Sequence, residues 1–194
     1  MTEIDEALLT APDDLEAELE TFRIDEETAQ QFFFAYLGVR DLTAKRPDVL
    51  AAVNRNPMFW KTTHYSMFVS TFIGLGRMFD QQSAHNVNLL IRMVERNLPT
   101  LNRKALRDRK AKVITPDQAA QYVASKHEMT IDDVRVLRKG IANWRRIYEP
   151  VYRHIRDHLA HNRKDVSDLD ALLAMTGIEE MKRMFGFFHA LHEG

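Results

Sequence analysis

The sequence predicts an all-α protein, an up-and-down helical bundle with additional flanking helices. Its 194 residues include only 7 glycines and 6 prolines, too few for the many tight turns of an all-β protein. Leu, Ala, Glu, Arg, Lys and Met dominate the composition, and these residues favour helices. Apolar residues also recur at the three- and four-residue steps that place them on one helix face. No alternating strand pattern and no internal repeat stands out.

The N-terminal part predicts a loose acidic arm followed by two helices. Residues 1–11 are expected to form the arm, and Asp13-Asp14 then suits a helix start, because acids stabilise the positive end of the helix dipole. A second, longer helix is expected over 25–44. We therefore divide the chain into an acidic arm with a short helix, 1–24, and a helical bundle domain, 25–194.

Proline, glycine and an apolar stripe define the next two helices. Pro47 begins a short helix, which the run Asn54-Arg55-Asn56-Pro57 ends. The helix expected from about Met58 to Asp80 carries the clearest core stripe. The stripe consists of Tyr65, Phe68, Phe72, Leu75 and Phe79. Gly74 and Gly76 in the same helix predict close approach by a neighbouring helix.

Capping residues and one proline divide the rest of the chain into helices. Three hydroxyl residues are expected to cap the helices that follow them: Ser83, Thr115 and Thr130. The helix from Thr130 reaches Pro150, which must kink it or begin a second segment ending near Asn162. Ser167-Asp168 is expected to cap a short piece, and Gly177 precedes a final helix.

Composition narrows the classes of protein that fit. The absence of cysteine excludes disulfides, cysteine nucleophiles and thiolate metal sites. The acidic N-terminus does not resemble a secretion signal, and no uncharged apolar run is long enough to span a bilayer. We expect a soluble cytoplasmic protein without membrane contact.

The net charge of −1 hides a strong asymmetry along the chain. Residues 1–28 hold eleven acids and one base, whereas residues 135–164 hold nine bases and two acids. A basic C-terminal half suits phosphate-rich partners. A solvated helix face, or attraction between the two halves of the chain, explains the same charges, and charge alone does not decide between these interpretations.

The helix after Pro150 carries the densest set of chemically active side chains. One apolar ridge is expected to face the core: Ile147, Val151, Ile155 and Leu159. His154, His158 and His161 lie beside this ridge. Asp157 is one turn before His161, so its carboxylate can orient the imidazole and raise its pKa by favouring the charged form.

The spacing of Arg156 and His161 places them poorly for pairing within one straight helix, and they can converge if the helix end unwinds at His161 or if a second chain brings its own copy alongside. They are five residues apart, which on one straight helix gives roughly 140° of rotation and roughly 7.5 Å of rise. A two-fold axis beside the helix would bring two histidines and two arginines to one cleft. Histidine can move protons at a 2′-hydroxyl or a leaving oxygen, and arginine can stabilise charge on phosphoryl oxygens. This set of groups suits phosphodiester cleavage.

The run Arg156-Asp157-His158-Leu159-Ala160-His161, followed by Asn162, resembles the HEPN superfamily signature of an arginine, four residues and a histidine. The ending Ala160-His161-Asn162 and the run Leu75-Gly76-Arg77-Met78-Phe79-Asp80 look like its abortive-infection branch. A weaker similarity extends over about 32–191.

The resemblance implies a dimeric helical bundle with the motif at the dimer cleft. Many members are metal-independent endoribonucleases that leave cyclic phosphate ends and act as toxins or in phage defence; others only bind RNA or a protein partner. In this chain Arg156 would stabilise the phosphate, Asp157 would tune the site and His161 would be the acid or base. Further RNA contacts are expected from Arg153, His158, Asn162 and Arg163. The resemblance implies no cofactor and no metal, and an antitoxin is a possible protein partner.

Three alternatives stay open. Arg153 and His158 satisfy the same spacing as Arg156 and His161, although the Ala160-His161-Asn162 ending favours the later register. The histidines of this helix can instead bind a metal, together with His189 and His192, because four-residue spacing suits zinc. Each histidine can also be a plain polar residue at a helix end.

Arg77 and Asp80 are a second place to look for function. Both lie at the end of the apolar 58–80 helix. They can form a buried pair that fixes the bundle, or they can reach the cleft beside the motif. We favour the structural pair.

Overall fold

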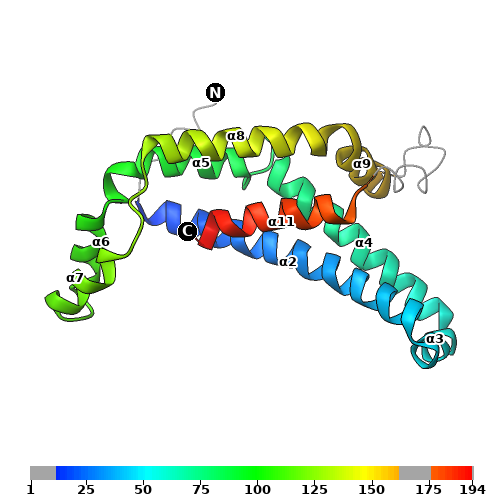
Figure 1. The fold of residues 1–194 in the computed structure, drawn as a ribbon. Coiled ribbons are helices and arrows are strands. Elements are labelled where there is room, and N and C mark those ends of the chain that lie inside the picture. The colour runs from blue at the N-terminus through cyan, green and yellow to red at the C-terminus, as the bar shows by residue number, and fades with distance from the viewer. Residues whose placement is uncertain (1–11, 162–175, 194) are drawn as a thin grey trace.

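The computed structural model describes residues 12–161 and 176–193, and within these ranges the chain forms helices and no strands (Figure 1). The all-α prediction is therefore confirmed. The helices are α2 (Pro12–Lys45), α3 (Pro47–Asn54), α4 (Pro57–Phe79), α5 (Val87–Asn97), α6 (Arg103–Lys110), α7 (Pro116–Ala124), α8 (Ile131–Ile147), α9 (Arg153–His161) and α11 (Ile178–Glu193). A 3₁₀ turn (Leu98–Thr100) follows α5, and a π-helical turn (Tyr148–Tyr152) joins α8 to α9. None of the described helices is long and apolar enough to cross a membrane.

One helix replaces the two that the sequence predicts at the N-terminal end. Helix α2 runs without a break across residues 24 and 25. The physical reason is that no glycine or proline occurs between Pro12 and Gly38, so nothing interrupts the backbone hydrogen bonds. Leu15 and Phe22 of its first half are buried in the core. The division into an arm and a bundle domain stays a prediction.

Helices α2 and α4 lie side by side and form the long axis of the molecule (Figure 1). Gly74 of α4 is the point of closest approach, because an added Cβ would lie 2.6 Å from Cβ of Ala29 in α2. The prediction that Gly74 admits a neighbouring helix is confirmed. Helix α3 closes one end of this pair, and the α6–α7 hairpin lies at the opposite end of the molecule.

The core is built from buried side chains of α2, α4, α5, α8, α9 and α11, together with Tyr148 and Tyr152 of the π-helical turn. Phe79 stacks on Tyr148, with ring centroids 4.4 Å apart, and also contacts Phe188 edge to face. The predicted stripe holds from Phe68 onward. Tyr65 is the exception: it is 53% exposed and lies on the part of α4 beyond the core.

Two of the three predicted helix caps are confirmed. Thr115 and Thr130 each form a capping box at the start of α7 and α8. Ser83 does not cap α5. Instead Asn86 does, because its side-chain oxygen accepts hydrogen bonds from the backbone N–H groups of Asn88 and Leu89.

Pro150 redirects the chain, as the sequence predicts. It lies inside the π-helical turn that separates α8 from α9, and a π turn is a usual way for a helix to bend around a residue that cannot donate its N–H. Tyr148 and Tyr152 of this turn are buried, and burial raises the pKa of both phenols. The Tyr152 hydroxyl donates to Glu180 of α11 at 2.8 Å, which ties the turn to the last helix.

Candidate functional site

Helix α9 presents its apolar ridge to the core and its charged residues to the surface. Ile155 is fully buried, and Ile147, Val151 and Leu159 pack partly buried against the core, as predicted. Arg153 and His154 are exposed, whereas Arg156, Asp157 and His158 are half-buried.

Arg156 and Asp157 form the tightest polar contact of the motif. The guanidinium Nε and Nη2 atoms of Arg156 both donate to Oδ1 of Asp157, at 2.9 and 2.6 Å. The two side chains are only 20% and 15% exposed. Burial acts to lower the pKa of Arg156, but the Asp157 hydrogen bond and nearby negative charge outweigh it, so the pKa is raised. Arg156 therefore stays charged and is held in one orientation.

Gly76 of α4 makes room for Arg156. A Cβ at this position would lie 2.3 Å from Cδ of Arg156, far inside contact distance. The close approach that the sequence predicts at Gly76 is therefore confirmed, with a side chain of α9 as the neighbour. The absence of a Cβ lets the Arg156 side chain pass close against α4.

Asp80 supplies a second carboxylate to Arg156 from the end of α4. Nη1 of Arg156 lies 3.5 Å from Oδ2 of Asp80. Asp80 is fixed locally, because its backbone N–H donates to the carbonyl of Gly76 and its Oδ1 accepts from the N–H of Gln82. These residues border an open surface cavity of about 390 Å³, lined by Ile73, Gly76, Arg77, Asp80, Gln82, Ser83 and Arg156.

The buried Arg77–Asp80 pair that we favour from the sequence is wrong. Arg77 is 63% exposed and pairs with Asp25 of α2 at 3.3 Å. Asp80 turns the other way, towards the motif, which is the alternative left open above. The physical reason is that each residue finds a partner on a neighbouring helix: Asp25 of α2 for Arg77, and Arg156 of α9 for Asp80.

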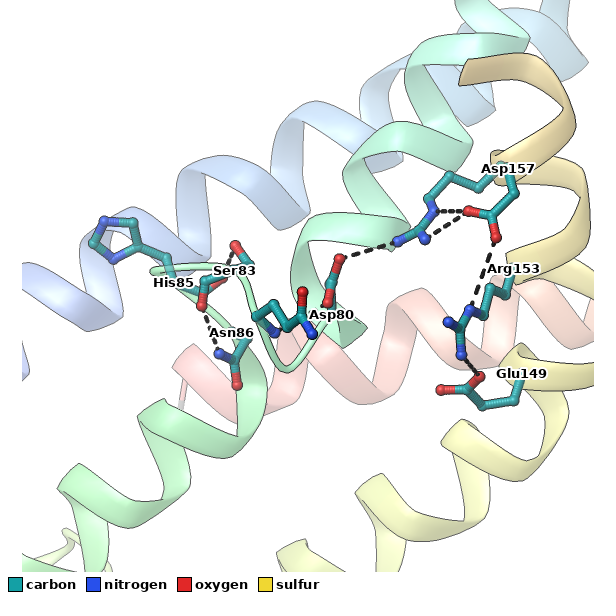
Figure 2. A network of polar contacts seen from close by, with 9 residues as sticks. Asp80, Ser83, His85, Asn86, Glu149, Arg153 and Asp157 are labelled. Carbon is teal, nitrogen blue, oxygen red and sulfur yellow. Dashed lines mark hydrogen bonds and ion pairs between the residues drawn. The ribbon is translucent and has the colours of Figure 1, made fainter. Parts of the chain in front are cut away.

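Arg153 extends the same polar network on the surface side. Its Nη1 donates to Glu149 at 2.7 Å, and its Nε lies 3.9 Å from Oδ2 of Asp157. The Glu149 hydrogen bond raises the pKa of Arg153. These contacts form one chain, with Asp157 in the middle (Figure 2). On one side Arg156 joins Asp157 to Asp80, and on the other side Arg153 joins Asp157 to Glu149.

Part of the predicted site cannot be placed. The side chain of His161, the last residue of α9, lies outside the described residues, as do Asn162, Arg163 and the Ser167-Asp168 cap. Sequence reasoning missed the Arg156–Asp80 contact, because 76 residues separate the two. The only signal was the occurrence of Asp80 in the run that resembles the abortive-infection branch.

The described histidines of α9 do not form a metal cluster with the last helix. Within the described part of the chain, His189 and His192 group with Glu26 of α2, and neither His154 nor His158 belongs to that group. The joint metal site that the sequence left open, with α9 and the last helix together, is not formed by these side chains.

The helices, together with the paired Arg156 and Asp157 on the helix that follows the π-helical turn, place the protein among all-α bundles with a polar surface site. The chain belongs to the AbiU2 family of HEPN proteins, because the family model HEPN_AbiU2, described as AbiU2, matches residues 12–192. This match confirms the resemblance to the abortive-infection branch of the HEPN superfamily. No curated protein and no solved structure matches the chain.

Proposed function

We propose that the protein is a metal-independent endoribonuclease that acts as a cytoplasmic homodimer in phage defence or in a toxin–antitoxin pair. The observation that carries the proposal is the fixed, half-buried guanidinium of Arg156 at the edge of an open cavity, one residue before Asp157. A charged group held in one orientation in a partly desolvated site is what stabilising a phosphoryl transition state requires.

The proposed reaction is cleavage of the RNA backbone by attack of a 2′-oxygen on the adjacent phosphorus, which leaves a cyclic phosphate end. His161 takes the proton of a 2′-hydroxyl, and the 2′-oxygen attacks the adjacent phosphorus. The bond to the 5′-oxygen breaks, and that oxygen receives a proton from the second histidine of the dimer cleft. The products are a 2′,3′-cyclic phosphate and a 5′-hydroxyl. Arg156 binds the non-bridging oxygens, on which negative charge builds up.

The contacts of Arg156 suit this task. Two of its N–H groups are occupied by Asp157 at short distances, whereas the Asp80 contact is long, at 3.5 Å. A phosphate can replace Asp80 at Nη1 while Asp157 keeps the guanidinium in place. Arg153, His158, Asn162 and Arg163 are proposed as RNA contacts.

The test is RNA cleavage by the purified protein in EDTA, with analysis of the product ends. We expect Arg156→Ala to lower the rate by about 10²–10³-fold, the usual effect of removing one transition-state contact. His161→Ala is expected to be at least as severe. Arg153→Ala and His158→Ala test the alternative register: as RNA contacts they should weaken RNA binding, whereas the cleavage rate at saturating RNA should stay close to that of the wild type. Arg153 is the more exposed arginine and pairs with Glu149 instead of lining the cavity.

Three results are decisive. Cleavage that survives EDTA and disappears only with Arg156 and His161 supports the proposal and the later register. If cleavage is lost only in the Arg153 and His158 variants, these two residues and not Arg156 and His161 form the motif. Cleavage abolished by EDTA contradicts the metal-independent mechanism.

A second candidate function is a HEPN-like module that binds RNA or a protein partner without cleaving. It is favoured by the charge of the described site, where Arg153 and Arg156 face three carboxylates: Asp80, Glu149 and Asp157. Such a surface weakens non-specific attraction for RNA. A folded dimer that binds RNA or a co-purifying antitoxin, and cleaves no RNA offered to it, identifies this second function.

A further inference from the structure

Glu26 is a fully buried carboxylate on α2, and it faces two histidines of the last helix. Its side chain is 0% exposed. His189 and His192 lie three residues apart on α11, so both project to the same side of that helix. Helix α11 packs on α2, and this packing brings together groups that are 166 residues apart in the sequence. Carboxylates are almost never buried completely unless a cation or a hydrogen-bonding group balances them.

The three side chains converge on one point. Oε2 of Glu26 lies 3.2 Å from Nε2 of His192 and 3.6 Å from Nδ1 of His189. One ligand atom from each residue lies within 4.8 Å of the others. Two atoms bound to the same tetrahedral zinc ion are about 3.3 Å apart, as follows from metal–ligand bonds of about 2.0 Å. The observed distances to Glu26 bracket that value.

Hydrogen bonds leave this cluster incomplete. Among the described residues, three of its buried atoms have no hydrogen-bond partner: Oε1 of Glu26, Nδ1 of His189 and Nδ1 of His192. Only the contact between Glu26 and His192 lies within hydrogen-bond distance. A buried polar atom without a partner is costly, and one bound cation would satisfy the Glu26 carboxylate and His189 together.

We propose that Glu26, His189 and His192 bind a divalent transition-metal ion of the zinc type. One carboxylate oxygen and two imidazole nitrogens are a ligand set that such ions prefer. Water fills the remaining position. His192 is 2% exposed and closes the inner side, whereas His189 is 44% exposed and gives the ion a path from solvent.

The ion would act as a clamp between α2 and α11. Metal bound only by the folded arrangement stabilises that arrangement by mass action. The site uses none of the residues assigned to RNA cleavage, so it does not rest on the proposed function. EDTA would remove the clamp and lower the stability of the bundle without touching the chemistry at Arg156.

The test is metal binding by tag-free protein that has been stripped with a chelator. Calorimetric titration with Zn²⁺ is expected to give one ion per chain and a higher melting temperature. Co²⁺ should show the strong visible absorption of a low-symmetry site. His189→Gln is the main variant, since a half-exposed residue can change without unfolding the protein. We expect it to weaken binding by more than about tenfold, the cost of losing even an outer-shell partner.

Matched variants separate this site from the other histidines. His192→Gln and Glu26→Gln should weaken Zn²⁺ binding at least as much as His189→Gln, with circular dichroism confirming that each variant folds. His85→Gln is the control, because His85 pairs with another buried glutamate of α2, Glu18, as a single histidine. His158→Gln controls for the motif helix. The proposal is overturned if folded wild-type protein binds no Zn²⁺ or Co²⁺, or if binding persists in His189→Gln and disappears in His158→Gln.

Discussion

Gly76 decides the position of Arg156, and this gives a prediction at the scale of a single residue. In Gly76→Ala the new methyl group would meet Cδ of Arg156 at 2.3 Å, so the arginine must move away from Asp80. We expect RNA cleavage to fall sharply. Stability should change by less than about 1 kcal/mol, because alanine favours the helix by a similar amount. Cleavage rate, urea unfolding and the NMR signal of the Arg156 Nε–H measure these effects.

Gly74→Ala is the matched control for this prediction. Its added methyl group would lie 2.6 Å from Cβ of Ala29, between two helix backbones that cannot move independently. The expected result is the reverse: a loss of about 1–3 kcal/mol of stability, as for an overpacked core, with Arg156 left in place. Equal effects of the two substitutions on cleavage would contradict the role given to Gly76.

The sequence predicts contacts between near neighbours better than contacts between distant residues. Thr115 and Thr130 each form a capping box with a residue three positions later, and both caps follow from local spacing. The Asp80 contact depends on how α4 ends against α9, and the Glu26 cluster depends on how α11 docks on α2. Neither docking is encoded in local spacing. Glu26 therefore could not be distinguished, from the sequence, from the surface acids around it.

At the scale of the element, Asn86 is the residue that starts α5. Its Oδ1 accepts two backbone N–H groups at 3.1 Å, and its Nδ2 donates to the carbonyl of Ser83 at 2.9 Å. Asn86→Ala should lower the free energy of unfolding by about 1–2 kcal/mol, the upper range for a lost cap. Urea denaturation measures it. Ser83→Ala is the control, with an expected change within about 0.5 kcal/mol, as is usual on the surface. A larger loss of stability in Ser83→Ala than in Asn86→Ala would show that Ser83, and not Asn86, caps α5.

The capping box of α8 predicts a pH dependence. The Thr130 hydroxyl, followed by the Thr130 N–H and His127, lowers the pKa of Asp133 from 3.8 to about 2. A depressed carboxyl pKa contributes stability that is fully present above the unfolded value of 3.8 and is lost as pH falls through about 2. The melting temperature of Asp133→Asn should therefore lie below wild type at neutral pH, and the two should converge in acid. In a Thr130→Ala background most of this pH dependence should disappear.

Helix starts were predictable where one residue dominates and not where two compete. Thr115 and Thr130 each precede a helix with a suitable partner three residues later, and both caps are confirmed. Ser83 and Asn86 are both good capping residues, and the choice between them depends on which one is buried against the core. The continuous α2 was missed for a related reason, because acids inside a helix resemble acids at a helix start.

At the scale of the whole molecule, no ion pair among the described residues joins an acid of α2 to the basic stretch 135–164. Three acids of α2 have partners elsewhere in the chain. Asp25 pairs with Arg77, Glu18 with His85, and Glu26 with the two histidines of α11. These partners lie outside the basic stretch 135–164. Arg138 of that stretch pairs instead with Glu95 of α5. Asp25 and Glu26 thus join α2 to α4 and α11, and arginines of the basic stretch pair with acids near them, as Arg135 does with Asp132 and Arg153 with Glu149.

The proposed dimer gives a prediction that only the assembled molecule can test. We expect a solution mass of about twice 22.6 kDa by light scattering. Arg156→Ala and His161→Ala, each inactive alone, should regain a small part of the activity after their subunits are mixed and exchanged. A two-fold cleft would then hold one arginine and one histidine from different chains, and water would replace the missing second histidine as the proton donor to the leaving oxygen. Mixing wild type with either variant is the control for subunit exchange. A monomer in solution, or exchange without recovery, would mean that each chain has to supply Arg156 and His161 to its own site, and the shared cleft would be wrong.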